Sequence, residues 1–277
     1  MKRLKLFSNL IDKISVETIK LELMKTAYGT QDTFLSKLDS RILILWYLIF
    51  AILPWLFFNK TIIIALLIFM IVIASMSKVS KLIVALLSFS LIAEFSSIFI
   101  VSYFFGGGME SLGPLVLLST KLVIIALASI SVFASMDPEK FSDALLSFGL
   151  SGRYCFGVSY GYRILPLLFE EYNNIFNSFR LRGKMPEEKG FLGWRYIYYY
   201  IKVVILGFYP MILNTAKRTR TTVEALELKG FTYSLDNDEV KKLKLSYMKV
   251  GKRDILFLAS SIGIVAIIIT IGQIYPL

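Results

Sequence analysis

Apolar and polar residues follow one another in long blocks along this chain. The apolar runs cover residues 42–58, 61–76, 82–105, 115–136 and 255–275. A run of about 20 apolar residues is long enough to cross the hydrocarbon core of a bilayer as a helix. The first two runs are short for a span and are separated by only two residues, so we expect a thin or tilted hairpin there.

This pattern predicts an all-α membrane protein with about five transmembrane helices and further amphipathic helices inserted before the last one. Charges interleave with apolar residues near the N-terminus, which predicts interfacial amphipathic helices; a solvated helix packed on the rest of the protein is the alternative. The predicted organisation is an interfacial segment at 1–40, a four-helix transmembrane block at 41–136, a cytoplasmic helical domain at 137–253 and a final span at 254–277.

The distribution of basic residues predicts the orientation in the membrane. The net charge is +11, and all Lys and Arg residues except Lys60 and Lys121 fall within residues 1–41, the loop at 77–81 or the block at 137–253. The positive-inside rule places that side in the cytoplasm, with a cytoplasmic N-terminus and an external C-terminus at the cell membrane. The charge is explained by topology, and no nucleic-acid partner is needed.

One segment leaves the number of spans open. Residues 196–209 are apolar and aromatic, but Lys202 interrupts them and Arg195 precedes them. The uninterrupted length is short, so we expect an interfacial helix with tyrosines at headgroup level. Six spans are the alternative, and the two basic helix ends described below would then lie on opposite sides of the membrane.

The sequence contains few of the residues that catalysis or nucleotide binding requires. The chain has no histidine and a single cysteine, Cys155, so it lacks the commonest general base and the ligands of a Cys/His metal cage. Neither Gly183-Lys184 nor Gly251-Lys252 fits a Walker A motif, because the required first glycine and the final Ser or Thr are missing. We expect a non-catalytic protein that binds no ATP and no resident metal or cofactor.

Two ionisable residues lie inside predicted spans, Glu94 in the third and Lys121 in the fourth. Charges at this depth are costly and often functional. Glu94 and Lys121 are either a structural pair, with outward snorkelling of Lys121 as a variant, or part of a transport path in a self-sufficient secondary carrier or channel.

Two helix-like runs in the basic block share a pattern. Each opens with proline and ends with a cation followed by glycine: Pro166 to Arg182-Gly183, and Pro210 to Lys229-Gly230. Ordinary helix C-caps, with glycine in the left-handed conformation and a cation matching the helix dipole, explain each end taken alone. Repetition on one membrane face favours docking of the cations onto carboxylates of another protein. The expected apolar stripes are Leu168, Tyr172, Ile175, Phe176 and Phe179 on the first run, and Ile212, Ala216, Thr219, Val223 and Leu226 on the second.

These features together resemble the transmembrane (T) components of energy-coupling factor (ECF) transporters, the EcfT/CbiQ family. Their two Ala-Arg-Gly-like motifs correspond here to Leu181-Arg182-Gly183 and Leu228-Lys229-Gly230. Lys229 keeps the charge of the family's arginine but loses its bidentate fork. The further matches are Leu38-Asp39-Ser40-Arg41, the run 135–145 and the run 163–171.

The resemblance implies a coupling subunit of an ATP-driven importer of vitamins or transition metals. Two cytosolic ABC-type ATPase subunits would hold ATP and Mg²⁺, and each would receive one motif helix. A membrane-embedded S component would bind the substrate and pack against the apolar side of the coupling helices. The residues expected at that contact are Phe176, Phe179, Phe191, Trp194, Phe208 and Met211.

Overall fold

The computed structural model describes residues 33–77, 79, 81–104, 112–183 and 194–275, and every regular element within these ranges is a helix. The predicted interfacial segment at 1–40 therefore lies mostly outside the described residues. The chain forms two units, which we call the transmembrane unit (22–149 and 244–277) and the helix-pair unit (1–21 and 150–243). Each unit is described by itself.

The transmembrane unit contains all five predicted spans as helices, which confirms the all-α membrane fold. Its elements are α3 (Ser40–Leu56), α4 (Lys60–Met76), α5 (Lys81–Phe104), α6 (Leu112–Phe133), α7 (Pro138–Ser147) and α12 (Lys252–Ile274). Helix α7 and residues 244–253 pack with the membrane helices, although the sequence pattern places both in the predicted cytoplasmic domain at 137–253.

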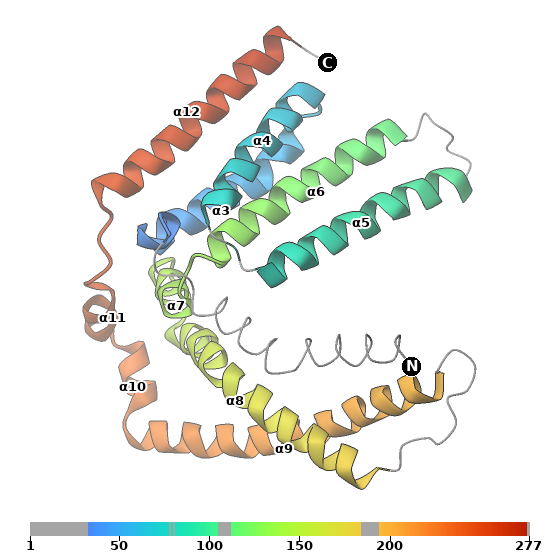
Figure 1. The fold of residues 1–277 in the computed structure, drawn as a ribbon. Helices are drawn as coiled ribbons and strands as arrows, with labels where there is room; N and C mark the ends of the chain where they lie inside the picture. Colours follow the sequence, from blue (N-terminus) through green and yellow to red (C-terminus); the bar gives the residue numbers. More distant parts are fainter. Residues whose placement is uncertain (1–32, 78, 80, 105–111, 184–193, 276–277) are drawn as a thin grey trace. The chain divides into compact units, whose positions relative to one another are not determined.

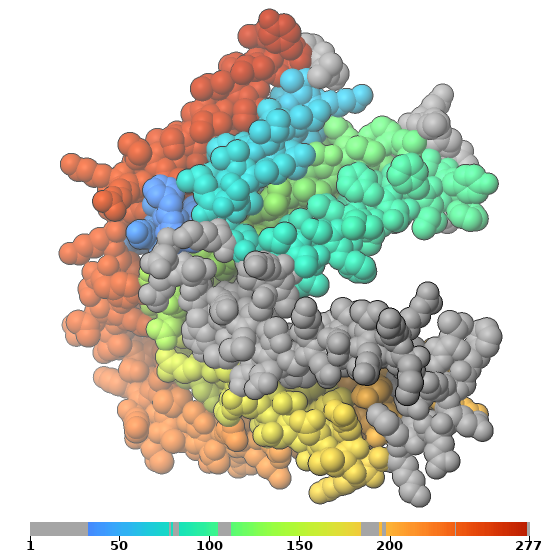
Figure 2. All heavy atoms as spheres, in the orientation of Figure 1, coloured from blue at the N-terminus to red at the C-terminus, as the bar shows by residue number. Residues whose placement is uncertain are grey.

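Helix α6 organises the core of this unit, because it packs against α3, α4 and α5, while α12 packs against α4 and α3 (Figure 1). The rings of Trp46 and Phe50 lie 4.5 Å apart at the centre of α3. Helix α5 instead leaves most of its apolar side chains at the surface, among them Phe89 and Phe99 (Figure 2). Apolar surface of this extent is typical of a helix that contacts lipid. The fully buried side chains include Leu66, Met70, Ile124, Ala128 and Val132.

The short hairpin of α3 and α4 is pinned at the turn between them. Each helix has 17 residues, or about 26 Å at 1.5 Å per residue, slightly less than the hydrocarbon thickness. The Asn59 side chain caps α4 by accepting a hydrogen bond from the Thr61 amide at 3.0 Å. Its amide group also donates to the carbonyl oxygen of Gly272 at 2.6 Å, which ties the start of α4 to the end of α12.

Gly272 lets α12 approach α4 closely, since a Cβ added there would overlap the side chain of Ile62. We expect Gly272→Ala to lower the stability of the transmembrane unit by about 1–2 kcal/mol, because overpacking outweighs the gain in helix propensity. Gly263→Ala on the same helix is the control: its Cβ would meet no other atom within 4 Å, so it should be neutral or slightly stabilising. Thermal unfolding in detergent at one fixed scan rate measures both. Equal melting temperatures for the two variants would contradict the close approach.

The helix-pair unit is built on two long antiparallel helices, α8 (Gly152–Arg182) and α9 (Trp194–Leu228), followed by α10 (Phe231–Asp236) and the start of α11 (Asp238–Leu245). Pro166 and Pro210 lie inside α8 and α9, so the prediction that proline opens each helix is wrong. An interior proline removes only one backbone hydrogen bond, and packing between two long helices compensates for it.

Residues 196–209 belong to α9 and form part of a longer helix than the sequence predicted. This segment is the first half of one continuous helix of 35 residues, so it is not separate from the helix predicted to begin at Pro210. By length and composition, Tyr198–Leu228 is long and apolar enough to cross a membrane, as are α6, α12 and Ile83–Phe104 of α5; α3 and α4 are shorter apolar helices.

Candidate functional site

The first cation-glycine motif, for which docking was predicted, lies at the C-terminal end of α8, where Arg180 and Arg182 occupy the last turn. Gly183 closes the helix by donating its N–H to the carbonyl oxygen of Phe179 at 2.9 Å. Its φ of −81° and ψ of 139° are extended, so the predicted left-handed conformation is wrong at this glycine. A Cβ at Gly183 would overlap the hydroxyl at the tip of the Tyr199 side chain on α9, so glycine lets that hydroxyl keep its present position.

The second motif lies at the C-terminal end of α9. The amides of Lys229 and Gly230 donate to the carbonyl oxygens of Leu226 and Glu227, at 3.1 and 2.9 Å. Gly230 has a φ of 76° and a ψ of 24°, which confirms the left-handed conformation predicted for it. Only glycine adopts this conformation without strain, and the chain then turns directly into α10.

Both motifs present an exposed leucine immediately before the cation. Leu181 is 87% exposed and Leu228 is 90% exposed, and Arg182 and Lys229 are exposed beside them. Burying one such leucine in a partner is worth roughly 1.5–3 kcal/mol, and the adjacent cation adds directional pairing with a carboxylate. Each helix end therefore carries the elements of a small docking surface.

The two motifs lie at opposite ends of the helix pair, a feature that the sequence did not predict. Gly183 meets Tyr199 near the start of α9, whereas Phe156, near the start of α8, packs against Phe231 just after the end of α9. Their ring centroids are 4.4 Å apart. Antiparallel packing thus separates the two cations by roughly the length of α8, about 47 Å for its 31 residues at 1.5 Å per residue.

The packing of α8 on α9 confirms the stripe predicted for α8, whose five residues are all half-buried. The stripe predicted for α9 is wrong in part, because Ile212, Ala216 and Val223 are exposed. Tyr172 and Ile175 of α8 lie against Gly207, where an added Cβ would meet both side chains at an ordinary contact distance of 3.6 Å. Among the residues of α9 whose burial is described, those buried or half-buried are Tyr199, Val203, Gly207, Pro210, Met211, Thr215, Thr219, Thr222 and Leu226.

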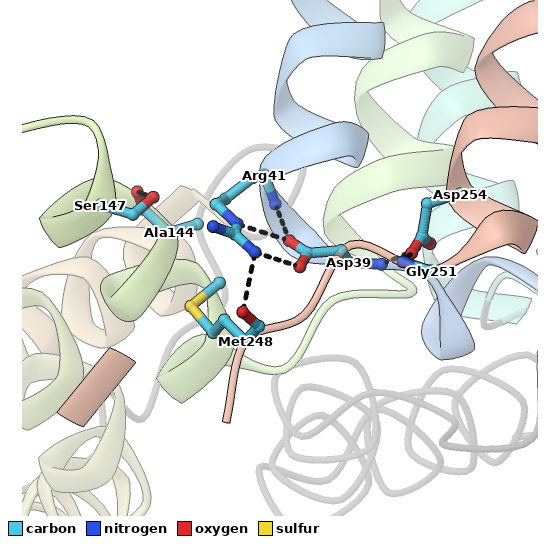
Figure 3. Close-up of polar contacts among 7 residues, drawn as sticks. All are labelled: Asp39, Arg41, Ala144, Ser147, Met248, Gly251 and Asp254. Atoms are coloured by element: carbon cyan, nitrogen blue, oxygen red, sulfur yellow. Dashed lines mark hydrogen bonds and ion pairs between the residues drawn. The ribbon is translucent and has the colours of Figure 1, made fainter. Parts of the chain in front are cut away.

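A second polar site lies in the transmembrane unit, around the Leu38–Arg41 motif at the start of α3 (Figure 3). The Asp39 carboxylate caps α3 by accepting a hydrogen bond from the Arg41 amide at 2.9 Å. It also accepts from Nε and Nη2 of the Arg41 side chain at 3.0 and 2.7 Å, which is the bidentate fork typical of arginine. The Asp39 N–H donates to Oδ1 of Asp254 at 2.9 Å, and Arg41 Nη2 donates to the carbonyl oxygen of Met248 at 3.1 Å.

This Asp39 cluster, consisting of Asp39, Arg41, Met248 and Asp254, joins the start of α3 to the chain that enters α12. Asp254 completes it, because its Oδ2 accepts a hydrogen bond from the Gly251 amide at 2.7 Å, at the start of α12. Asp254 was not predicted as a site residue; an acidic residue in the first turn of the last apolar helix is the signal that points to it. Burial by itself raises the pKa of Asp39, but the hydrogen bonds and charge of Arg41 outweigh this effect and leave the pKa below its ordinary value.

The family motif at 135–145 also makes polar contacts, which join α7 to the residues that lead into α12. Asp137 caps α7, with its side chain accepting from the Glu139 amide at 2.9 Å and Pro138 at the first helical position. The buried Asp143 carboxylate accepts a hydrogen bond from the Tyr247 hydroxyl and pairs with Lys244 at 2.9 Å. Burial, followed by the hydrogen bond to Asp143, raises the pKa of Tyr247 above its ordinary value, so its hydroxyl stays protonated and remains a donor.

Comparison with known proteins decides the family. The sequence matches the family described as CbiQ, cobalt transport protein, over residues 31–239. The chain belongs to the CbiQ family. It is thus a multi-pass membrane component of cobalt- or ECF-type transporters. A search of curated proteins finds no match to the chain.

The described residues of this CbiQ-family chain hold no group of three or more His, Cys, Asp and Glu side chains that could bind a metal ion. Lys121 is 3% exposed, and its ammonium lies 4.1 Å from the ring centre of Phe58 and 5.8 Å from that of Trp55. Glu94 is half-buried on α5, and the structure records no ion pair between these two described residues. Aromatic rings, rather than the carboxylate of Glu94, therefore lie next to the buried ammonium of Lys121.

The residues predicted to contact an S component divide into two groups in this CbiQ-family chain. Trp194 and Phe208 are exposed on α9, whereas Phe176, Phe179 and Met211 are half-buried; Phe191 lies outside the described residues. Trp194 and Phe208 belong to a continuous exposed stripe with three- and four-residue spacing, which is one face of a helix. We call it the α9 outer stripe: Trp194, Tyr198, Ile201, Ile205, Phe208 and Ile212.

Proposed function

We propose that this CbiQ-family chain is the coupling subunit of an ATP-driven ECF-type importer. The observation that carries the proposal is the pair of exposed Leu-cation-Gly ends at opposite ends of one antiparallel helix pair. Such an arrangement suits two ATPase subunits, each receiving one helix end in a groove lined by carboxylates. The wide separation allows both subunits to bind at once without competing for the same surface.

The α9 outer stripe supports the second half of the proposal, contact with a membrane-embedded S component. A continuous row of six exposed apolar and aromatic side chains is covered in the membrane either by lipid or by another protein. Trp194 and Phe208 are the large aromatic anchors of the kind that contribute most to binding at interfaces. Displacement of α8 and α9 by the ATPases would then be passed to the S component, which binds the vitamin or transition metal.

The orientation follows from the same proposal. Docking to cytosolic ATPases puts Arg182 and Lys229 together on the cytoplasmic side, with the N-terminus on that side and the C-terminus outside. Helix α9 then lies along the membrane rather than across it, although its length allows a span. The charges support this arrangement, because Lys202 lies in the first half of α9, and Lys217, Arg218 and Arg220 lie in the second.

Reconstitution of transport tests the proposal. The chain is purified with its co-expressed ATPases and S component, and uptake of radiolabelled substrate is measured in proteoliposomes with ATP inside or outside. We expect uptake only when all subunits are present and ATP is on the ATPase side. Substrate flux through liposomes that contain this chain alone would instead support a self-sufficient carrier using Glu94 and Lys121.

A further inference from the structure

Within the described residues, the chain passes between its two units at two places. The first crossing, between residues 149 and 150, joins α7 to α8, and the second, between residues 243 and 244, lies inside α11. Gly149 directly precedes the first crossing with a φ of 92°, a left-handed conformation that favours glycine. Displacement of α8 and α9 is therefore carried covalently into the described part of the transmembrane unit at these two places.

The buried Asp143 carboxylate on α7 joins the two crossings. It lies shortly before Gly149 on the outgoing chain, and its Oδ1 is 2.9 Å from Nζ of Lys244, the first residue of the returning chain. Its Oδ2 accepts a hydrogen bond from the Tyr247 hydroxyl. Each oxygen of one carboxylate thus holds a different residue of the returning chain. We call Asp143, Lys244 and Tyr247 the Asp143 clasp.

Beyond the Asp143 clasp, the returning chain is fixed to helices that lie in the membrane. The carbonyl oxygen of Met248 accepts a hydrogen bond from Arg41 at the start of α3, and the Met248 side chain packs against the apolar core of the unit. The Gly251 amide donates to Asp254 in the first turn of α12. Helix α7 itself packs against α3. The clasp therefore ties the returning chain to α7 before the Asp39 cluster ties it to α3 and α12.

Burial makes the Asp143 clasp resistant to separation. The Asp143 side chain is 8% exposed, so water cannot readily replace the partners of its two oxygens. The pair of Lys241 with Asp238 on α11 is the contrast, because its atoms are 3.5 Å apart and the Asp238 side chain is 85% exposed. Such a solvated pair contributes little. Of these two carboxylates, Asp143 is the one that can hold the chain under load.

We propose that the Asp143 clasp anchors the helix pair for energy coupling, by fixing both crossings to α7 so that displacement by the ATPases acts against the membrane helices. Without the clasp, the two connections would move independently, and bending of the chain between Lys244 and Met248 would absorb part of the displacement. The clasp residues are positioning residues, since they act through the helix pair. This inference rests on the proposed coupling function and adds the anchor that such a lever requires.

Amide hydrogen exchange of the purified full-length chain in detergent tests whether the clasp holds the returning chain. Tyr247→Phe removes only the hydroxyl, and Lys244→Gln removes the charge. The matched controls are Tyr103→Phe, at an exposed tyrosine of α5, and Lys242→Gln, at an exposed lysine of α11. We expect exchange across residues 244–251 to become about 10-fold faster in Tyr247→Phe, since a hydrogen bond to a charged group is worth about that factor. Lys244→Gln should have a smaller effect, because the Lys244 side chain is 50% exposed, and the controls should match wild type.

Coupling is measured in proteoliposomes that contain the chain with its co-expressed ATPases and S component, as the amount of substrate taken up per ATP hydrolysed. We expect this ratio to fall severalfold in Tyr247→Phe, while the ATPases still co-purify with the chain in normal yield. Tyr103→Phe should leave the ratio unchanged. A merely structural role of the hydroxyl would lower the melting temperature and leave the ratio at its wild-type value.

Two results would overturn the proposal: exchange across residues 244–251 that is unchanged in Tyr247→Phe, or faster exchange with an unchanged coupling ratio. An equal loss of coupling in Tyr103→Phe would also overturn it. Absence of ATP-dependent uptake by the wild-type complex would reject the proposed function and, with it, the coupling role of the clasp. The exchange measurement distinguishes these failures, because it uses this chain alone and depends on no ATPase.

Discussion

Arg182→Glu combined with Lys229→Glu is expected to abolish co-purification with the ATPase subunits. Each substitution places a negative charge at a helix end that we propose to lie against carboxylates of the partner. Juxtaposed like charges at an interface cost several kcal/mol, enough to reduce affinity more than a hundredfold for each contact. Affinity purification of the tagged chain from membranes, followed by quantification of the ATPases that come with it, measures the effect.

Single substitutions measure how much each of the two proposed docking surfaces contributes to ATPase binding. Arg182→Glu should weaken binding more than Lys229→Glu, because arginine forms a bidentate pair with a carboxylate and lysine acts as a point charge. The control is Lys217→Glu with Lys242→Glu, which reverses two exposed cations away from the helix ends and should leave the complex intact. An unchanged ATPase yield with the double variant at Arg182 and Lys229, at normal membrane insertion, would rule out the docking role.

Asp39→Ala is expected to be the most destabilising single substitution among the residues discussed in the transmembrane unit. It removes the N-cap of α3 and leaves the Arg41 guanidinium without its bidentate partner. Asp39 is 4% exposed and Arg41 is 27% exposed, so solvent compensates only part of the lost pairing. We expect a loss of about 2–3 kcal/mol, which corresponds to a fall in melting temperature of roughly 5–10 °C for a chain of this size.

Asp137→Ala provides the matched control for Asp39→Ala. Asp137 also caps a helix of the same unit, but the hydrogen bond that its carboxylate accepts from the Glu139 amide is exposed to solvent. Loss of such a cap costs about 1 kcal/mol. Thermal unfolding of both variants at one scan rate gives two melting temperatures. Their difference measures how much the Asp39 cluster stabilises the protein beyond the helix cap alone. Similar melting temperatures would show that the contacts to Arg41 and Asp254 contribute little.

The pH dependence of the Asp39 variant follows from the lowered pKa of this carboxyl. A carboxyl with a lower pKa in the folded state binds fewer protons there than in the unfolded state. Its contribution is therefore complete above the ordinary aspartate pKa of about 4, and it is lost as the pH falls through the lower folded value. The difference in melting temperature between wild type and Asp39→Ala should be constant from pH 6 to 8 and should shrink under strongly acidic conditions.

Much of the site was predictable because it depends on local signals. The cation-glycine endings at 182–183 and 229–230 are the ends of α8 and α9, and the left-handed conformation of Gly230 follows from its place after the helix. Gly183 differs because its conformation is extended, and the hydroxyl of Tyr199, distant in sequence, lies where a Cβ would be. Interior Pro166 and Pro210 misled the prediction of helix starts, since proline favours the first turn of a helix but is tolerated within a packed one.

The sequence by itself determined the five apolar helices, the basic block between the fourth and fifth, and the family motifs, because hydrophobic run length and charge are properties of contiguous residues. Only the tertiary structure decided which face of α9 packs on α8, the separation of the two docking motifs, and the contacts that join Asp39 to Asp254 and Asp143 to Tyr247. These features depend on pairs of residues far apart along the chain. Antiparallel packing of α8 on α9 brings such pairs together in the helix-pair unit, and packing of α3 against α7 and α12 does so in the transmembrane unit; no local pattern encodes either one.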